Sequence, residues 1–362
     1  MSIRSISLVV LLLASILIIG CEGAKPTATP ALSTATLLPS PTVPPPSATA
    51  VSQTINLEKV AALDLPDSFV NTVVFSPDSR TLVTGDLNGE ALLWERETWA
   101  KTIFLPARST RAEVANIPYW GTLALSPDGN IIVQAYGDNG DVTGRNRAGK
   151  ELFAFSYGAR VYSVEISPDG KFLAVGGLSS HIIIFDLQTR QPAADLRNDR
   201  EDIVTMTFSP DGKTLAANYR APERVFTVWD TDTWQAVDTI NLALPPNNGY
   251  HDSVFSADGK ELAIASTEAA EIKFLDLATR KIVREFPEHT RASYQIAFSP
   301  DGSLLASAGD DRTLRLWDMK TGVNVKTIRN GHEAGSVAFS PDSTLITFSV
   351  WGEGVQVWAV VP

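Results

Sequence analysis

The chain has 362 residues, 44% hydrophobic and 20% charged, which is enough for one large or two ordinary globular domains. Its 41 acidic residues outnumber its 30 basic residues, and the net charge of −11 disfavours nucleic acid as a partner because phosphates would be repelled. The single cysteine excludes an intramolecular disulfide and any zinc or iron–sulfur site built on several cysteines.

The first twenty residues have the pattern of a secretory leader. Arg4 supplies a positive charge, and residues 6–19 form an apolar run of 14 residues, shorter than the roughly 20 that span a bilayer. The run ends in Gly20-Cys21, which resembles the lipobox of bacterial lipoproteins. That resemblance implies cleavage after residue 20 and acylation of Cys21, so that acyl chains would hold the protein at a membrane. The alternative is a plain secretory signal with an incidental cysteine.

Residues 21–54 form a second segment, dominated by Pro, Thr, Ser and Ala. Proline removes backbone donors and favours extended polyproline conformations, so we expect a disordered, semi-rigid linker. It would hold a folded domain, residues 55–362, away from the bilayer.

A five-residue string with the consensus Phe-Ser-Pro-Asp-Gly recurs seven times in residues 55–362. The copies begin at residues 75, 125, 166, 208, 255, 298 and 339, so their spacings are 50, 41, 42, 47, 43 and 41 residues. A period of this length indicates a repeat architecture. The string itself predicts a turn, because Pro presets φ at position i+1 and Gly suits position i+3.

Each turn is flanked by strand patterns. An alternating run precedes the turn, as in Ser336–Phe339, and an apolar run follows it, as in Leu304–Ala308. A third strand pattern, such as Thr313–Asp318, and a fourth, such as Val325–Ile328, complete the unit. Because no useful amphipathic helix pattern follows residue 55, we predict an all-β fold of about seven four-stranded antiparallel units.

The units resemble the WD-repeat family of β-propellers. The name-giving dipeptide occurs as Trp229-Asp230 and Trp317-Asp318. The sixth unit also matches the family's buried His–Ser–Asp–Trp hydrogen-bonded chain, with His289, Ser307, Asp311 and Trp317. The second unit departs furthest, since residues 139–146 contain no aromatic side chain. The resemblance covers roughly residues 57–362 and implies a seven-bladed propeller.

The two ends of the repeat region predict how the ring closes. Only two strand patterns follow the seventh turn, in residues 344–350 and 355–361, whereas a spare one, residues 57–65, precedes the first unit. We predict that an N-terminal strand near residues 58–64 pairs with residues 354–360 in the last blade, which removes an open sheet edge.

Positions counted back from the turn proline, or from Ala257 in the fifth unit, separate into two sets. Positions −2, −4 and −7 are mostly apolar and are expected to face the core between blades. Positions −6 and −8 vary in chemistry, and in similar propellers the start of the innermost strand lies at the mouth of the central channel. Aromatic residues and Arg dominate binding hot spots. The candidate partner-binding residues there are Phe69, Asn71, Tyr119, Arg160, Tyr162, Asp202, His251 and Tyr294. The alternative is that these side chains merely fill the channel mouth.

Motifs for catalysis are missing from the sequence. His332-Glu333 lacks a second histidine four residues on, and no nucleophile elbow or phosphate-binding glycine loop occurs. Residues 138–141 lack the distal Glu of a calcium loop and are interpreted as a turn. We therefore predict no catalytic residue, no metal and no cofactor.

Two classes of function remain. The first is a monomeric, lipid-anchored, extracytoplasmic bacterial scaffold that binds a protein or peptide and contacts the membrane only through its anchor. The second is a propeller enzyme of the hydrolase, lactonase or dehydrogenase type, with His251, Asp252 and Glu165 as candidates at the central channel. If strand alternation holds, Asp252 and Glu165 lie on the face opposite His251, which weakens the enzyme hypothesis.

Overall fold

A computed structural model describes residues 55–65, 68–106, 123–136, 139–197, 202–219, 225–242, 250–266, 271–286 and 289–361. Within these ranges the chain forms 28 strands in seven antiparallel four-stranded sheets, and it contains no helix. The expectation of an all-β, seven-bladed propeller is confirmed. The leader and linker assigned to residues 1–54 lie outside the described residues.

The first four blades follow one another along the chain. Blade 1 consists of β2 (Val70–Phe75), β3 (Thr81–Asp86), β4 (Ala91–Glu95) and β5 (Lys101–Leu105). Blade 2 consists of β6 (Leu123–Leu125), β7 (Ile131–Tyr136), β8 (Asp141–Asn146) and β9 (Glu151–Ser156). Blade 3 consists of β10 (Val161–Ile166), β11 (Phe172–Gly177), β12 (His181–Asp186) and β13 (Gln191–Arg197). Blade 4 consists of β14 (Ile203–Phe208), β15 (Thr214–Tyr219), β16 (Val225–Asp230) and β17 (Ala236–Asn241).

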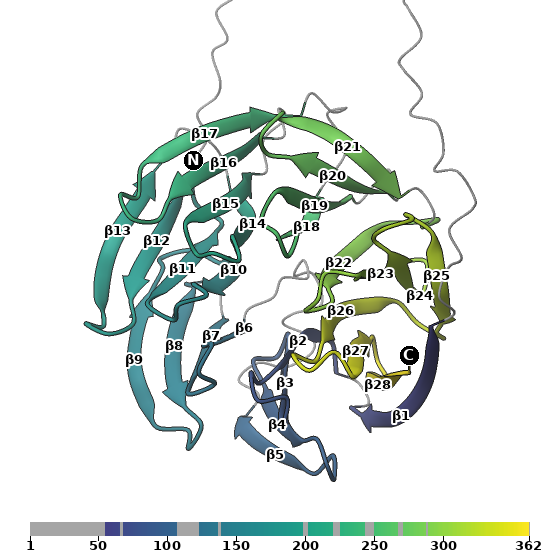
Figure 1. The fold of residues 1–362 in the computed structure, drawn as a ribbon. Helices are drawn as coiled ribbons and strands as arrows, with labels where there is room; N and C mark the ends of the chain where they lie inside the picture. The colour runs from purple at the N-terminus through teal and green to yellow at the C-terminus, as the bar shows by residue number, and fades with distance from the viewer. Residues whose placement is uncertain are drawn as a thin grey trace, which may run out of the picture. The chain divides into compact units, whose positions relative to one another are not determined.

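The last three blades complete the ring. Blade 5 consists of β18 (Tyr250–Phe255), β19 (Glu261–Ser266), β20 (Ile272–Asp276) and β21 (Lys281–Phe286). Blade 6 consists of β22 (Ser293–Phe298), β23 (Leu304–Gly309), β24 (Thr313–Asp318) and β25 (Asn324–Arg329). Blade 7 consists of β26 (Ala334–Phe339), β27 (Leu345–Val350), β28 (Gly354–Val361) and β1 (Asn56–Asp64). The first strand of each blade is the innermost and borders the centre of the ring (Figure 1).

Each repeated turn is held by its own serine and aspartate. In blade 4 the Ser209 hydroxyl donates to Asp211 Oδ1 at 2.7 Å, and Ser209 Oγ accepts the Thr214 amide at 3.0 Å. Gly212 follows with φ of 70°, a conformation that L side chains disfavour. The hydrogen bonds from Ser209 and from the Lys213 amide lower the pKa of Asp211 below its usual range. The recurring string therefore works as a turn, as its chemistry predicts.

The hydrophobic core lies between neighbouring blades. The apolar residues at positions −2, −4 and −7 of the first unit, Phe75, Val73 and Val70, are all buried in one cluster with residues of blade 7. Trp317 of blade 6 is 1% exposed and stacks on Phe286 of blade 5, with ring centroids 5.1 Å apart. Burial thus couples each sheet to its neighbours, and the predicted inter-blade orientation of these positions is confirmed.

The N-terminal strand closes the ring as predicted. β1 pairs antiparallel with β28 from Asn56 opposite Val361 to Asp64 opposite Gly354, and in Figure 1 the purple strand lies beside the yellow end of the chain. The register shifts between Lys59 and Ala61, so Val60 is an extra residue in a β-bulge.

This bulge decides which neighbour each buried leucine of β1 contacts. Leu57, 8% exposed, packs in a cluster with residues of blade 6, whereas Leu63, 4% exposed, packs in a cluster with residues of blade 1. Two residues six positions apart would face the same side of a regular strand, and the extra residue reverses this. One strand therefore fastens blade 7 to both neighbours.

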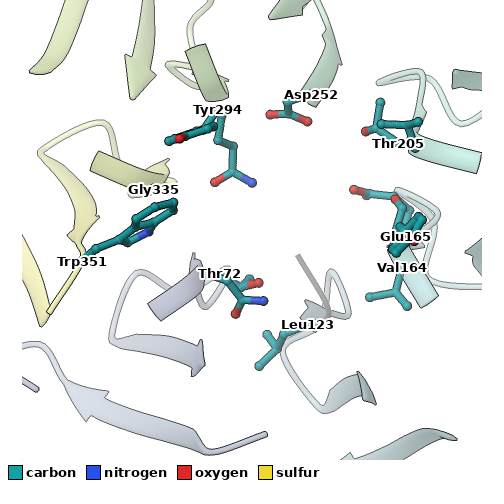
Figure 2. A pocket seen from close by; sticks show the side chains of 14 residues that line it. Thr72, Leu123, Val164, Glu165, Thr205, Asp252, Tyr294, Gly335 and Trp351 are labelled. Carbon is teal, nitrogen blue, oxygen red and sulfur yellow. The ribbon is translucent and has the colours of Figure 1, made fainter. Parts of the chain in front are cut away.

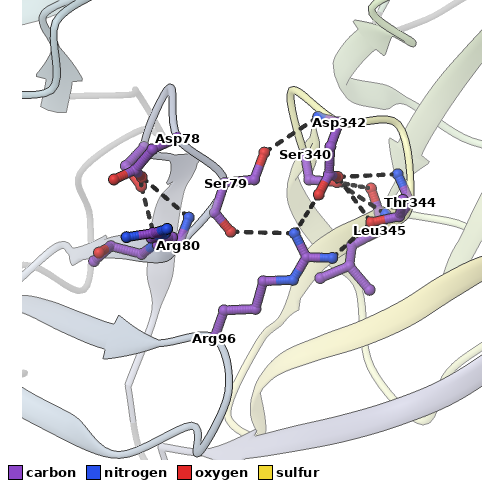
Figure 3. A network of polar contacts seen from close by, with 10 residues as sticks. Asp78, Ser79, Arg80, Arg96, Ser340, Asp342, Thr344 and Leu345 are labelled. Carbon is purple, nitrogen blue, oxygen red and sulfur yellow. Dashed lines mark hydrogen bonds and ion pairs between the residues drawn. The ribbon is translucent and has the colours of Figure 1, made fainter.

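Polar contacts reinforce the seam between blades 7 and 1 (Figure 3). The Arg96 guanidinium donates to Asp342 Oδ2 at 2.5 Å, to Thr344 Oγ1 at 2.6 Å and to the Ser79 carbonyl at 3.2 Å. The Ser79 hydroxyl oxygen in turn accepts the Asp342 amide at 3.1 Å. The two turns at this seam are thus joined in both directions.

Blade 2 forms despite its divergent sequence. Its inner strand, β6, has only three residues within the described part of the chain, but all four strands pair in order. Phe153 of β9 lies over Gly144 of β8, where a Cβ would approach the ring to 2.2 Å. Phe153 also packs against Phe185 of blade 3 at 4.8 Å between ring centroids, so it supplies an aromatic contact between these two blades.

Candidate functional site

The inner strands contain a repeated irregularity that determines which side chains face the central channel. In the five blades numbered 1, 3, 4, 5 and 6, the pairing of the first two strands shifts between positions −7 and −5; in blade 7 it shifts between −7 and −4. Position −6 is therefore an extra residue, and the alternation of side chains is interrupted there.

The central channel contains a cavity of about 110 Å³. Residues at positions −6 and −5 of four blades line it together, which strict alternation does not allow, and blade 7 adds its position −6. These residues are Asn71, Thr72, Tyr162, Ser163, Val204, Thr205, Tyr294, Gln295 and Gly335, with Asp252 from position −5 of blade 5. Figure 2 shows side chains converging on this space from several blades.

Position −5 links the blades to one another. The Ser336 hydroxyl oxygen accepts the amide of Val73 in the next blade at 3.0 Å, and Ser163 Oγ accepts that of Met206 at 3.2 Å. Likewise Asp252 Oδ2 accepts the Ile296 amide at 3.0 Å, and Gln295 Oε1 accepts the Val337 amide at 2.9 Å. In each case the amide belongs to position −4 of the following blade.

The sequence analysis missed this position, although the printed sequence carries a signal for it. Position −5 is polar in all seven units: Thr72, Thr122, Ser163, Thr205, Asp252, Gln295 and Ser336. A polar residue recurring inside an otherwise apolar strand indicates that a buried backbone donor needs an acceptor.

Two carboxyl groups, Glu165 and Asp252, also line the cavity. Burial raises the pKa of Asp252 to about 7, against the opposing effect of hydrogen bonds from the Ile296 and Ser253 amides. Burial, together with the nearby charge of Asp252, raises the pKa of Glu165 to about 8. The channel is therefore a place where negative charge is unfavourable without a cation.

The alternation argument used against an enzyme is wrong for β10. It placed position −6 on the face opposite Asp252 and Glu165, but Tyr162 at −6 and Glu165 at −3 line the same cavity, because Tyr162 is the extra residue of the bulge. The side chain of His251 lies outside the described residues, so its own placement stays a prediction.

The candidate partner-binding residues divide into three groups. Asn71, Tyr162 and Tyr294 line the cavity. Phe69, Arg160 and Asp202, from position −8, are half-buried and do not line it. Tyr119 and the side chain of His251 lie outside the described residues.

Trp351 is a cavity residue that the sequence analysis missed. It follows β27 and stacks on Tyr294 with ring centroids 5.3 Å apart, and it meets Phe69 edge to face at 6.1 Å. Gly335 makes room for it, because a Cβ at that residue would lie 2.6 Å from Trp351 Nε1. The signal was the glycine at position −6 of the last unit, where five of the other six units have larger side chains.

The His–Ser–Asp–Trp chain of blade 6 is present as a buried network. The distance from His289 Nε2 to Ser307 Oγ is 2.6 Å, and Trp317 Nε1 donates to the same hydroxyl oxygen at 2.9 Å. Asp311 Oδ2 lies 3.1 Å from His289 Nδ1. Although burial opposes the shift, hydrogen bonds from His289 and Thr313 hold the pKa of Asp311 well below its usual range. This network links segments within one blade, and none of its four residues lines the channel cavity.

Two other features are absent from the described residues. No three His, Cys, Asp or Glu side chains in these ranges lie close enough together to hold a metal ion. The same ranges, being strands and turns, include no apolar helix of membrane-spanning length.

The fold defines the class: this protein is a seven-bladed β-propeller, and three segments of it match the WD40 repeat. The family model described as "WD domain, G-beta repeat" matches residues 58–95, 149–186 and 280–318. Each match begins near the outermost strand of one blade and ends in the third strand of the next, so the sequence repeat is offset from the blade.

Several curated proteins are similar over part of the chain. WD repeat-containing protein SL1-17 of Schistosoma mansoni is 31% identical over 162 residues, 45% of this chain and 52% of that protein. The human WD repeat and SOCS box-containing protein 1 is 36% identical over 115 residues, 31% of this chain and 27% of that protein. An uncharacterized WD repeat-containing protein of Synechocystis, sll1491, is 32% identical over 144 residues, 39% of each chain. The chain thus spans about half or less of the length of these relatives.

Proposed function

We propose that this protein is an extracytoplasmic scaffold, held to a bacterial membrane by acyl chains on Cys21, that binds a protein or peptide at the channel mouth. The observation that carries the proposal is the convergence of Tyr162, Tyr294 and Trp351 from three blades on one cavity. Aromatic side chains supply contact area at little conformational cost and dominate binding hot spots. The similarity to WD-repeat proteins supports the same role.

Partner capture tests the binding face. The full chain is used as bait, and the double variant Tyr162→Ala with Tyr294→Ala is expected to lose a specifically captured protein. The matched control is Ile103→Ala with Val237→Ala, which removes two side chains, 60% and 58% exposed, from outermost strands. Equal capture by the wild type and the tyrosine variant would place the binding site elsewhere.

Mass spectrometry tests the anchor. The protein from membranes of its host is expected to begin at Cys21 and to carry acyl mass on that residue, whereas a Cys21→Ser variant keeps residues 1–20. An intact leader with a free thiol on the wild-type protein would contradict the lipid anchor.

A channel-sited enzyme is the second candidate, and one observation favours it. Glu165 and Asp252 have pKa values raised to about 8 and about 7, near the range in which a carboxyl group can both donate and accept a proton. The discriminating measurement is the metal content of the purified full chain. A stoichiometric divalent metal that Asp252→Asn releases would favour the enzyme.

A further inference from the structure

We propose that the central channel binds the ammonium group of a partner's lysine side chain, between the carboxylates of Glu165 and Asp252 and an aromatic wall of Tyr294 and Trp351. This inference deepens the proposed function and rests on it for the identity of the partner as a protein or peptide. It names the chemical group that the partner must bring into the channel.

Charge complementarity is the first argument. The described residues that line the cavity include two carboxyl groups and no Lys, Arg or His. Elsewhere the buried carboxylate of Asp311 has His289 and Arg315 within 3.2 Å. Glu165 has no such cation, and no described residue donates a hydrogen bond to its carboxylate. A cation entering the channel would supply the missing counter-charge.

Glu165 is also not explained by the architecture. It stands at position −3, where the other six units have small, aliphatic or hydroxyl side chains: Val74, Ala124, Thr207, Val254, Ala297 and Ala338. Among the described residues, no inter-blade hydrogen bond uses this position. A carboxylate inside the channel that neither pairs with a cation nor accepts an amide destabilises the fold, so a ligand that neutralises it gives a physical reason for its presence.

An unpartnered hydroxyl in the same cavity is the second, independent argument. Thr72 is 6% exposed, lines the cavity, and its Oγ1 has no hydrogen-bond partner among the described residues. An ammonium group has three donors and no acceptor. Thr72, Glu165 and Asp252 lie on different sides of the cavity (Figure 2), so together they offer acceptors to a group at its centre.

The remaining wall and the volume favour an alkyl ammonium over other cations. Tyr294 and Trp351 stack side by side, and aromatic faces attract cations and pack against methylene stems. The cavity of about 110 Å³ has room for several water-sized groups. A compact ammonium with three rotatable donors suits acceptors spread around this space better than a planar guanidinium with its five donors in a fixed fork.

The test uses the purified full chain and probes of known chemistry. Isothermal titration calorimetry at pH 9 compares n-butylammonium chloride with 1-butanol, its uncharged analogue, and acetyl-Gly-Lys-Gly-amide with the same peptide carrying norleucine or arginine. We expect binding of both ammonium probes, stronger for the lysine peptide, and none of the uncharged ones. The free amine reports on the cavity alone and needs no partner.

Two variants locate the site. Glu165→Gln keeps the shape of the side chain and is expected to weaken binding of n-butylammonium by about tenfold to hundredfold, as for loss of one hydrogen bond to a charged group. Glu95→Gln, which removes an exposed carboxylate on β4, is the matched control and should leave the affinity unchanged. If Glu165→Gln does not fold, Thr72→Val, which removes only the free hydroxyl, serves as the locating variant.

The pH dependence of the affinity for n-butylammonium distinguishes ion pairing from packing alone. Glu165 must ionise to hold the cation, and its pKa is raised to about 8, so affinity should rise as the pH increases from 6 to 9. The other titratable groups of the described lining are Asp252, Tyr162 and Tyr294. A flat profile in wild type would contradict ion pairing with Glu165.

Three results would overturn the inference: no binding of either ammonium probe, equal binding of 1-butanol, or equal affinities for wild type and Glu165→Gln. Failure here is distinguishable from failure of the proposed function. A partner whose capture depends on Tyr162 and Tyr294 but not on Glu165 would support the scaffold function and contradict the lysine-binding site. Amine binding without any captured partner supports the lysine site and contradicts the scaffold.

Discussion

Deleting Val60 together with Ala61 removes one exposed and one half-buried residue, yet we expect it to be among the more destabilising small changes in the propeller. Val60 is 48% exposed and is the extra residue of the bulge in β1. Loss of Val60 alone would leave Leu57 and Leu63 five positions apart in a regular strand, on opposite sides as they now are. Loss of both residues leaves them four apart, so that they must face the same side. Only one of them can then remain in its apolar site.

The expected loss of folding free energy follows from the residues that change position in β1. If the N-terminal half of β1 slips by one residue, Leu57 moves to the exposed place of Glu58, and Asn56 enters the site between blades 7 and 6. Loss of a buried leucine costs about 2–5 kcal/mol. An amide buried without a partner costs about 1–3 kcal/mol more. Fraying of the strand end would avoid the second cost only, so we expect a loss of at least about 2 kcal/mol.

Urea unfolding of the full chain, followed by tryptophan fluorescence, measures the loss. The matched control is deletion of Val60 alone, which removes the extra residue but keeps both leucines opposite their present partners and should cost clearly less than the double deletion. Hydrogen exchange of the β28 amides, which pair with β1, should accelerate in the double deletion only. A double deletion that costs less than about 1 kcal/mol, or no more than the single one, would refute the assignment of the two leucines to different neighbours.

Three further predictions concern the turns, the buried aspartate and the blade links. Ser343→Gly should stabilise the fold by about 1 kcal/mol in urea unfolding, because Ser343 has φ of 59°, whereas Ser79→Gly at φ of 57° should show no such gain, since Ser79 Oγ accepts an amide across the seam. Asp311, whose pKa is lowered in the fold, stabilises the protein above the usual pKa of about 4 and loses that contribution as the pH falls below it. Melting temperatures should therefore fall more steeply below pH 4 in wild type than in Asp311→Asn; equal slopes would contradict this. Ser336→Ala leaves the Val73 amide without its acceptor and should cost about 1–3 kcal/mol, whereas no measurable loss would show that water replaces the hydroxyl.

The sequence was sufficient to predict the ring and its closure. Seven spaced copies of one turn fix the number of blades, and the count of strand patterns at the two ends requires residues 57–65 to pair with the last blade. Both inferences depend on local patterns and on the need to avoid an open sheet edge. They did not require knowledge of any side-chain contact.

The candidate site was predicted less well. The physical reason is the extra residue at position −6, which forms a bulge in the inner strands of six blades. A bulge leaves no unambiguous mark in a single strand, so the alternation rule assigned positions −5 and −3 to one face and −6 to the other. The structure places Tyr162, Glu165 and Asp252 around one cavity instead. Trp351 was missed for a related reason: it enters the cavity from the turn after β27 through space that Gly335 leaves open, and this contact depends on tertiary structure.

The same bulge separates architecture from function inside the channel. Side chains at position −5 of four blades accept amides of the next blade, so a polar residue there follows from the need to join the sheets. Thr72, whose Oγ1 has no partner among the described residues, is not accounted for in this way. Asp252 is among the acceptors, although a neutral side chain such as Gln295 makes the same link elsewhere. Glu165 has no structural partner of this kind, and the charge of Asp252 adds to the cost of ionising it. The link between blades requires only one neutral acceptor at this place, whereas the channel contains two carboxyl groups. Architecture alone therefore does not explain this pair.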